Sequence, residues 1–332
     1  MDNKNKNNER GAFAEYAAQN NLLTAGDAGF TFTAATLSSL VVALIFSAVI
    51  YALAAAKGIS PAEYSSSLEQ KFVYYLFSYG LSSVSILTAI TAFSVYKKTK
   101  PFSPLPFKKF RAKYAAVGII MAAGLIFGFS ELNNLFVSLL GKIGYNKPDM
   151  TLPNEKWWQL IIWLVLAAAA PAFFEEVLFR GYILEGLKGL SAPFVILTGG
   201  LLFSLFHQNP QQTPYQFICG AAFFLVAYKS GSLWPSVIMH FTNNAIVLFA
   251  DFFFKEGFSS AATIALTAIG ILCFAGSAVY LLFFDKNSDG ERSIPVKNSP
   301  NHTKTRFFIY AAVGIAACLL MWFTDLITYM GA

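Results

Sequence analysis

The apolar residues of this chain gather in long runs that contain few charges, and polar residues separate each run from the next. A helix that crosses a bilayer needs about 20 consecutive apolar residues. The fifth and sixth runs are short and have Pro or Gly at their ends, so the number of spans is eight or nine. The pattern predicts an all-α fold, a polytopic membrane helix bundle of about 8–9 transmembrane helices. The runs cover about residues 33–56, 72–96, 114–130, 157–183, 193–207, 215–228, 232–250, 259–284 and 306–330.

The composition supports a membrane protein. Hydrophobic residues make up 56% of the chain and charged residues only 13%, whereas ordinary soluble domains carry about 25% charged residues. The first residues, 1–10, are polar, and no short apolar core of a cleaved signal peptide follows them. The three cysteines lie inside apolar runs, so we expect them to be packing residues and not disulfide partners.

Lysine and arginine are distributed unevenly over the predicted loops. If the N-terminus is cytoplasmic, 18 of the 24 basic residues, Arg180 included, fall on the cytoplasmic side. Cytoplasmic loops of membrane proteins carry such an excess. We therefore expect a multi-pass protein of the cell membrane with a cytoplasmic N-terminus. The net charge of +6 then indicates contact with anionic membrane lipids and not nucleic-acid binding.

Two segments between the runs carry their own predictions. Residues 97–113 interleave basic and aromatic residues with three prolines, which favours a lipid-facing cytoplasmic loop over a binding surface for a partner. The segment ELNNLFVSLLGKIGY, residues 131–145, predicts a separate amphipathic helix in the outer membrane interface.

The fourth run contains three charges within the sequence PAFFEEVLFRGYIL, residues 171–184. A charge at the centre of a membrane helix costs about 2.5–3.5 kcal/mol on insertion scales, so such residues are functional candidates. Neighbouring helical residues point about 100° apart, so Glu175 and Glu176 face different directions. Arg180 follows Glu176 by four residues and can neutralise it on one helix face. Glu175 is then the carboxylate that is free to face a reactant.

Two of the three histidines, His207 and His240, lie in apolar surroundings, and we assign no role to His302 in its polar loop. Asn244 lies four residues after His240 and therefore on the same helix face, and the spacing does not exclude Asn243. A buried carboxylate can act as a general base, and a histidine and an asparagine amide can donate to a developing oxyanion. Together these groups describe hydrolysis by an activated water.

The same residue types leave a metal site open. Two histidines and one glutamate, with water in the fourth position, are a common zinc ligand set. The sequence contains no HExxH motif, and no GxSxG motif that would indicate a serine hydrolase.

Three short motifs follow one another in the second half of the chain. EEVLFR (residues 175–180) matches EExxxR, FSLFH (203–207) matches FxxxH, and HFTNN (240–244) matches HxxxN. Their order and separation resemble the CPBP family of intramembrane proteases. That family includes the type II CAAX prenyl endopeptidases and bacterial bacteriocin-processing and self-immunity proteins. The resemblance covers about residues 155–250.

The resemblance implies a helix bundle around an intramembrane catalytic cavity that opens to the membrane and the cytoplasm. It implies that Glu175 activates water together with His207, and that His240 and Asn244 stabilise the oxyanion. Such enzymes have been described both as metalloproteases and as glutamate-dependent proteases, and an asparagine in the last motif suits an oxyanion better than zinc. We therefore expect no cofactor, with zinc on Glu175, His207 and His240 as the alternative. Supporting roles fall to the remaining motif residues, Glu176, Arg180 and Phe203.

The resemblance also divides the chain. We expect a polar cytoplasmic tail at 1–30, N-terminal transmembrane helices and loops at 31–154, a protease core at 155–254 and C-terminal transmembrane helices at 255–332. The expected partners are membrane lipids and a peptide or small membrane-protein substrate, with or without an attached lipid. Type II CAAX enzymes cleave after a prenylated cysteine, but we expect a leader peptide or bacteriocin-like peptide here.

Two other classes of function compete with a protease. A non-catalytic membrane scaffold or bacteriocin self-immunity protein would bind its partner without cleaving it. A transporter could use intramembrane Glu, Arg and His as a proton path. The chain lacks the repeated hydropathy pattern that is typical of transporters with two related halves.

Overall fold

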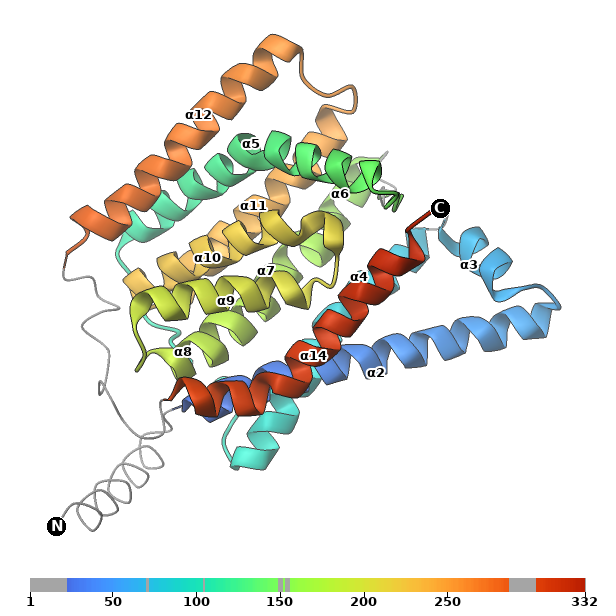
Figure 1. Ribbon diagram of the computed structural model, residues 1–332, viewed down its shortest axis with the longest axis horizontal. Helices are drawn as coiled ribbons and strands as arrows, with labels where there is room; N and C mark the ends of the chain where they lie inside the picture. The colour runs from blue at the N-terminus through green and yellow to red at the C-terminus, as the bar shows by residue number, and fades with distance from the viewer. Residues whose placement is uncertain are drawn as a thin grey trace.

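The computed structural model describes residues 23–69, 72–103, 105–148, 152, 156–286 and 303–331. These residues form helices, and within them the only strand-like feature is a single bridge between Tyr145 and Met330. The prediction of an all-α fold is confirmed. In chain order the elements are α2 Ala25–Lys57, α3 Pro61–Glu69, α4 Phe72–Lys97, α5 Ala112–Lys142, α6 Trp157–Trp163, η1 Leu164–Ala169, α7 Ala170–Glu176, η2 Val177–Ile183, α8 Leu184–Leu187, α9 Ala192–Phe206, η3 Pro210–Gln212, α10 Thr213–Ser230, α11 Trp234–Phe253, α12 Ser260–Val279, η4 Tyr280–Phe284 and α14 Lys304–Thr328 (Figure 1).

Seven helices in the described part of the chain are long and apolar enough to cross a membrane by length and composition. They correspond to seven of the nine predicted runs. The two short runs form α9 and α10, with 15 and 18 residues. The predicted count of eight or nine spans therefore depends on whether this pair crosses the membrane. The seven long helices are 25–57, 74–97, 112–142, 157–187, 234–253, 260–284 and 304–328.

Successive helices run back and forth between two ends of the bundle (Figure 1). At one end, Lys97 pairs with Asp27 across 3.0 Å, joining the end of α4 to the start of α2. Lys113 pairs with Asp285 across 2.5 Å, joining the start of α5 to the end of η4. The loop before α5 and the start of α11 meet there too, because the Ser232 hydroxyl donates to the Lys108 carbonyl. We call this end, where these loops and helix ends meet, the basic end.

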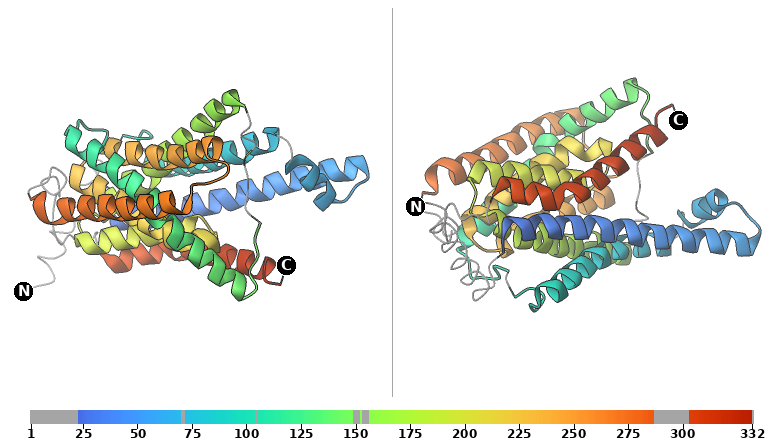
Figure 2. Two further views of the ribbon diagram at one scale, coloured as in Figure 1. Left: turned by 90° about the horizontal axis from the view of Figure 1, so that it is seen from above. Right: turned by 60° about the horizontal axis from the view of Figure 1, so that its bottom comes forward.

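A second set of contacts marks the opposite end, which we call the far end. The Tyr145 hydroxyl after α5 donates to Asp325 near the end of α14, with 2.6 Å between the oxygens, and Lys147 forms an ion pair with the same carboxylate. Burial raises the pKa of Tyr145 well above its ordinary value, and the hydrogen bond to Asp325 adds to that rise. Figure 2 shows that α2 extends beyond the other helices at this end and carries α3 there.

Glycines allow two of the helix pairs to pack closely. A Cβ atom on Gly270 of α12 would lie 2.3 Å from the backbone nitrogen of Gly128 of α5. A Cβ atom on Gly220 of α10 would lie 2.9 Å from the Cα atom of Gly200 of α9. Membrane helices commonly associate through such small residues. The close contact at Gly200 and Gly220 thus brings α9 and α10 together.

Two sequence predictions about helix bounds differ from the structure. The helix α2 begins at Ala25 and not near residue 33, because Thr24 caps it: its hydroxyl accepts from the Asp27 amide, and the Asp27 carboxylate accepts from the Thr24 amide. The expected polar tail therefore ends earlier, and its residues 1–22 lie outside the described residues. The separate amphipathic helix predicted for residues 131–145 is wrong, because α5 continues without a break to Lys142.

The helix that carries both glutamates runs continuously over residues 157–187. Two of its segments are wider than an α-helix, with π-helical turns at Leu164–Ala169 and Val177–Ile183. Such turns are frequent at functional sites. They bracket α7, so Glu175 and Glu176 lie directly before a π-helical turn.

Candidate active site

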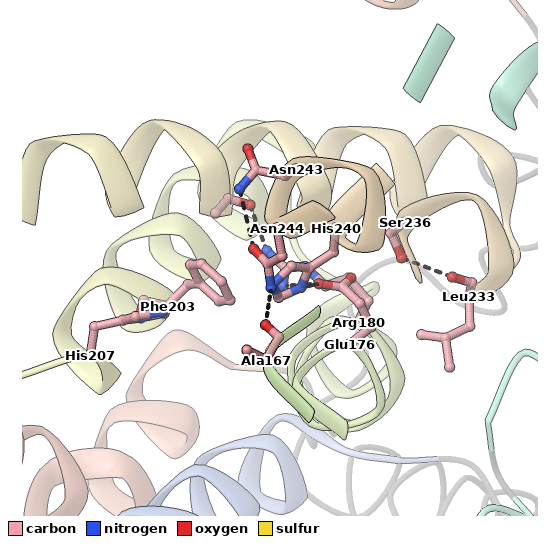
Figure 3. A network of polar contacts seen from close by, with 11 residues as sticks. Ala167, Glu176, Arg180, Phe203, His207, Leu233, Ser236, His240, Asn243 and Asn244 are labelled. Carbon is pink, nitrogen blue, oxygen red and sulfur yellow. Dashed lines mark hydrogen bonds and ion pairs between the residues drawn. The ribbon is translucent and has the colours of Figure 1, made fainter. Parts of the chain in front are cut away.

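Three helices meet around Glu176 and contribute all the motif residues. Glu176 ends α7 and Arg180 lies in η2, Phe203 and His207 lie at the end of α9, and His240 and Asn244 lie on α11 (Figure 3). The helix α9 stops at Phe206, so His207 occupies the first position after it.

Glu176 and Arg180 form the predicted pair. Arg180 Nη1 donates to Glu176 Oε1 across 2.7 Å, and both side chains are completely buried. Arg180 Nη2 donates to the Gly220 carbonyl of α10 across 2.8 Å. The guanidinium also lies over the rings of Phe203 and Phe224, each 4.6 Å from the Arg180 Cζ atom. Cation–π contact of this kind compensates part of the lost hydration. Although the loop count included Arg180 among cytoplasmic residues, its side chain lies inside the bundle.

His240 contacts the same carboxylate. Its Nδ1 atom lies 2.9 Å from Glu176 Oε1, and His240 is buried. A carboxylate paired with arginine only accepts hydrogen bonds, so Nδ1 of His240 donates and Nε2 is the nitrogen available for other contacts. Sequence reasoning missed this bond, because the two residues lie 64 positions apart on different helices. Glu176 therefore orients His240 in addition to pairing with Arg180.

The Phe203 ring lies between the two histidines. Its centroid is 4.8 Å from that of His207 and 5.8 Å from that of His240. His207 Nδ1 donates to the Phe203 carbonyl oxygen across 2.8 Å, so a neutral His207 ring has an acceptor at Nε2. The buried Phe203 ring thus separates the two imidazole rings. The FxxxH motif alone does not predict its contact with His240.

Glu175 differs from Glu176 in its surroundings. Its side chain is partly exposed, whereas Glu176 is buried. Its Oε2 atom is nevertheless buried and accepts no hydrogen bond from the residues that the structure describes. Glu176 Oε2 is likewise buried without a hydrogen-bond partner among the described residues, so the two carboxylates differ in exposure and in the two donors that contact Glu176 Oε1. The two adjacent glutamates therefore have separate surroundings, as their helical positions predicted.

Asn244 lies one turn after His240 and is partly exposed, like Glu175 and His207. Its Nδ2 atom donates to the Ala167 carbonyl oxygen across 3.4 Å. The chain of contacts thus joins Arg180, Glu176 and His240, continues through Phe203 to His207, and leaves Glu175, His207 and Asn244 as the more accessible polar groups.

The structure does not assemble the alternative zinc ligand set. Within the described residues, no group of three or more His, Cys, Asp or Glu side chains is arranged to hold a metal ion. Glu175, His207 and His240 do not fit a zinc site in this arrangement.

Comparison with known proteins matches part of the chain. No curated protein and no solved structure shows significant similarity to the chain. A family model, Type II CAAX prenyl endopeptidase Rce1-like, matches residues 156–246. The matched segment begins just before α6 and ends two residues after Asn244, within α11, so it contains all three motifs. Residues 156–246 are therefore similar to the Rce1-like type II CAAX prenyl endopeptidases, in agreement with the resemblance that the three motifs carry.

Proposed function

We propose that this protein is an intramembrane endopeptidase in which Glu175 activates the water that attacks a peptide bond. The observation that carries the proposal is the contrast between the two glutamates. Glu176 is completely buried and its Oε1 atom accepts from both Arg180 and His240, whereas Glu175 is partly exposed and no donor among the described residues bonds to its Oε2 atom. A general base needs such an available acceptor close to the proton that it takes.

The remaining groups suit the rest of the reaction. Glu175 takes one proton from water, and Nε2 of His207 accepts a hydrogen bond from the same water. The oxygen then attacks the scissile carbonyl carbon, and the carbonyl oxygen becomes an oxyanion. His240 Nε2 and the Asn244 amide donate to that oxyanion. When the C–N bond breaks, the proton held by Glu175 passes to the leaving amine.

Donation by His240 requires protons on both ring nitrogens, because Nδ1 already donates to Glu176. The ring is then positively charged and lies against the Glu176 carboxylate, which Arg180 also contacts. This gives the glutamate a role beyond its pair with Arg180, and we propose that Glu176, Arg180 and Phe203 support the reacting groups without contacting the substrate.

The proposed substrate is a membrane-associated peptide or small membrane protein. The name of the matching family describes cleavage of CAAX prenyl substrates, so a prenylated C-terminal peptide is one candidate class. Leader-like peptides without a lipid are the other. We propose a cell-membrane location with the N-terminus in the cytoplasm, a metal-independent reaction, and no nucleic-acid partner.

A cleavage assay with two matched carboxylate variants tests this proposal. Glu175→Gln removes the base, and Glu185→Gln removes a carboxylate from the same helix that pairs with Lys188. Purified protein in liposomes is mixed with membrane-tethered peptides, prenylated and unprenylated. We expect Glu175→Gln to lower kcat by about 10²–10⁴-fold, the usual contribution of a general base, and Glu185→Gln to retain activity.

A zinc chelator is added to a parallel set of reactions. Unchanged cleavage supports the metal-independent reaction, whereas loss that zinc restores would replace it with a metal mechanism. If Glu175→Gln cleaves as well as the wild type, Glu175 is not the base. If the folded wild type binds a peptide and cleaves none, the non-catalytic scaffold or immunity protein is the better description.

A further inference from the structure

Two polar residues beside the candidate site have no part in the reaction as described so far. Tyr215 lies in the first turn of α10, and Asn243 is buried on α11 next to Asn244. The Tyr215 hydroxyl lies 3.1 Å from Asn243 Oδ1, and Asn243 Nδ2 lies 3.3 Å from Asn244 Oδ1. Figure 3 shows Asn243 and Ala167 on opposite sides of Asn244. These contacts form a relay that runs from Tyr215 through both asparagines to the Ala167 carbonyl.

The sequence explains why the Ala167 carbonyl can accept from a side chain. In an α-helix this carbonyl would accept from the amide of residue 171, which is a proline and has no N–H. The π-helical segment Leu164–Ala169 surrounds it and further changes the backbone pattern. Asn244 Nδ2 donates to this carbonyl across 3.4 Å. The Ala167 carbonyl thus lacks the α-helical donor at residue 171 and accepts from α11 inside the bundle.

The Ala167 carbonyl also sets the direction of the whole relay. A carbonyl only accepts, so the Asn244 amide must present its nitrogen to Ala167 and its oxygen to Asn243. Asn243 must then donate with its own nitrogen, and its oxygen is left to face Tyr215. A phenol hydroxyl can donate, so every member has a matched partner. Reversing either amide would place two donors or two acceptors against each other.

We propose that Tyr215 and Asn243 are positioning residues that hold the Asn244 amide with its nitrogen toward the reacting carbonyl. The amide nitrogen carries two hydrogens. One of them is donated to the Ala167 carbonyl, and the planar amide group then points the second toward the developing oxyanion. An amide that turned over would present its oxygen there and repel the negative charge. This inference rests on the proposed function for its kinetic consequence, but the relay itself can be measured without any substrate.

The first measurement follows the side-chain amide directly. Protein labelled with ¹⁵N at asparagine is studied in detergent micelles by NMR, and the Asn244 signal is identified by its loss in Asn244→Leu. We expect Tyr215→Phe to shift both asparagine signals, because it removes the donor at the start of the relay. The control is Thr242→Val, which removes a hydroxyl on the same helix that donates to the Ile238 carbonyl of its own helix. An unchanged Asn244 signal in Tyr215→Phe would overturn the relay.

The second measurement tests positioning by kinetics. We expect Tyr215→Phe to lower kcat about 10-fold with KM unchanged, a smaller loss than the 10²–10³-fold typical of removing an oxyanion donor. Asn243→Leu should lower kcat further. The double variant should be no worse than Asn243→Leu alone, because Tyr215 acts only through Asn243. Additive losses, or a change confined to KM, would contradict the positioning role.

The two measurements separate the inference from the proposed function. If the wild type cleaves no peptide, the protease proposal fails, and the NMR signals still decide whether the relay orients Asn244. If the wild type cleaves and Tyr215→Phe moves the Asn244 signal without changing kcat, the relay exists but does not serve catalysis. That result would overturn the inference and leave the protease proposal standing.

Discussion

At the scale of single residues, Arg180 is the group on which the buried site depends most. It pairs with Glu176, donates to the Gly220 carbonyl of α10, and lies against the rings of Phe203 and Phe224. Its side chain therefore joins η2 to both α9 and α10. Removing one partner of a buried ion pair leaves an uncompensated charge, which is worse than never having formed the pair.

This dependence predicts an asymmetry between single and double variants. Arg180→Met should destabilise the protein by about 3–5 kcal/mol, because it leaves the Glu176 carboxylate buried without its main partner. Arg180→Met combined with Glu176→Gln should recover much of that loss, since no net charge then stays buried. The control is Lys97→Met, which breaks a partly exposed pair with Asp27 and should cost about 0–1 kcal/mol. Thermal unfolding in detergent measures all three, and equal losses in Arg180→Met and Lys97→Met would contradict the prediction.

Part of these contacts between site residues could be predicted from the sequence. The Glu176–Arg180 pair was predictable because a spacing of four residues along one helix places two side chains on one face. This contact depends on the local helix geometry and not on how the helices pack. The bond between Glu176 and His240 was not predictable, because no local rule sets which helix faces which. The same holds for Tyr215, whose partner lies 28 positions away on another helix. The roles assigned to Glu175, His207 and Asn244 stay predictions until the variants are measured.

At the scale of helices, close contact between glycines holds the bundle together. The helices α5 and α12 approach until a Cβ atom on Gly124 would lie 2.6 Å from the Phe274 backbone nitrogen. Gly128 follows Gly124 by four residues and meets Gly270 in the same way. Hydropathy predicted that these helices exist, but it carries no information on which pairs touch. Hydropathy also misplaces the end of α5. The polar residues that follow position 130 predict a new helix, whereas α5 continues through them to Lys142.

Two glycines on α12 allow a matched test of this packing. Gly270→Ala should destabilise the protein by about 1–3 kcal/mol, because the new methyl group would overlap the α5 backbone. Gly276→Ala introduces the same atom where nothing described lies within 4 Å, and it should be neutral or stabilising by up to about 1 kcal/mol. The unfolding temperature of each variant in the same detergent measures the difference. Similar effects at both positions would show that helix propensity dominates and that the close contact does not matter.

At the scale of the whole molecule, the side on which each long helix starts does not depend on whether α9 and α10 cross the membrane. The α9–α10 pair leaves from the basic end and returns to it, because α8 meets the start of α2 there and the Ser232 hydroxyl meets Lys108 there. Whether the pair crosses the membrane fully or turns within it, α11 starts on the same side. The end of α14 meets the loop after α5 at the far end, so the two ends of the described chain lie on opposite sides whichever count of spans holds.

Labelling of single cysteines tests which side faces the cytoplasm. In a protein whose three native cysteines are replaced by alanine, Lys98→Cys puts a thiol at the basic end and Lys255→Cys puts one at the far end, and both positions are exposed. Because the excess of lysine and arginine gathers at the basic end, we expect that end to face the cytoplasm. A membrane-impermeant maleimide added to intact cells should then label Lys255→Cys and leave Lys98→Cys unlabelled until the membrane is opened. The reverse pattern would contradict both the cytoplasmic N-terminus and the expectation that the basic end faces the cytoplasm.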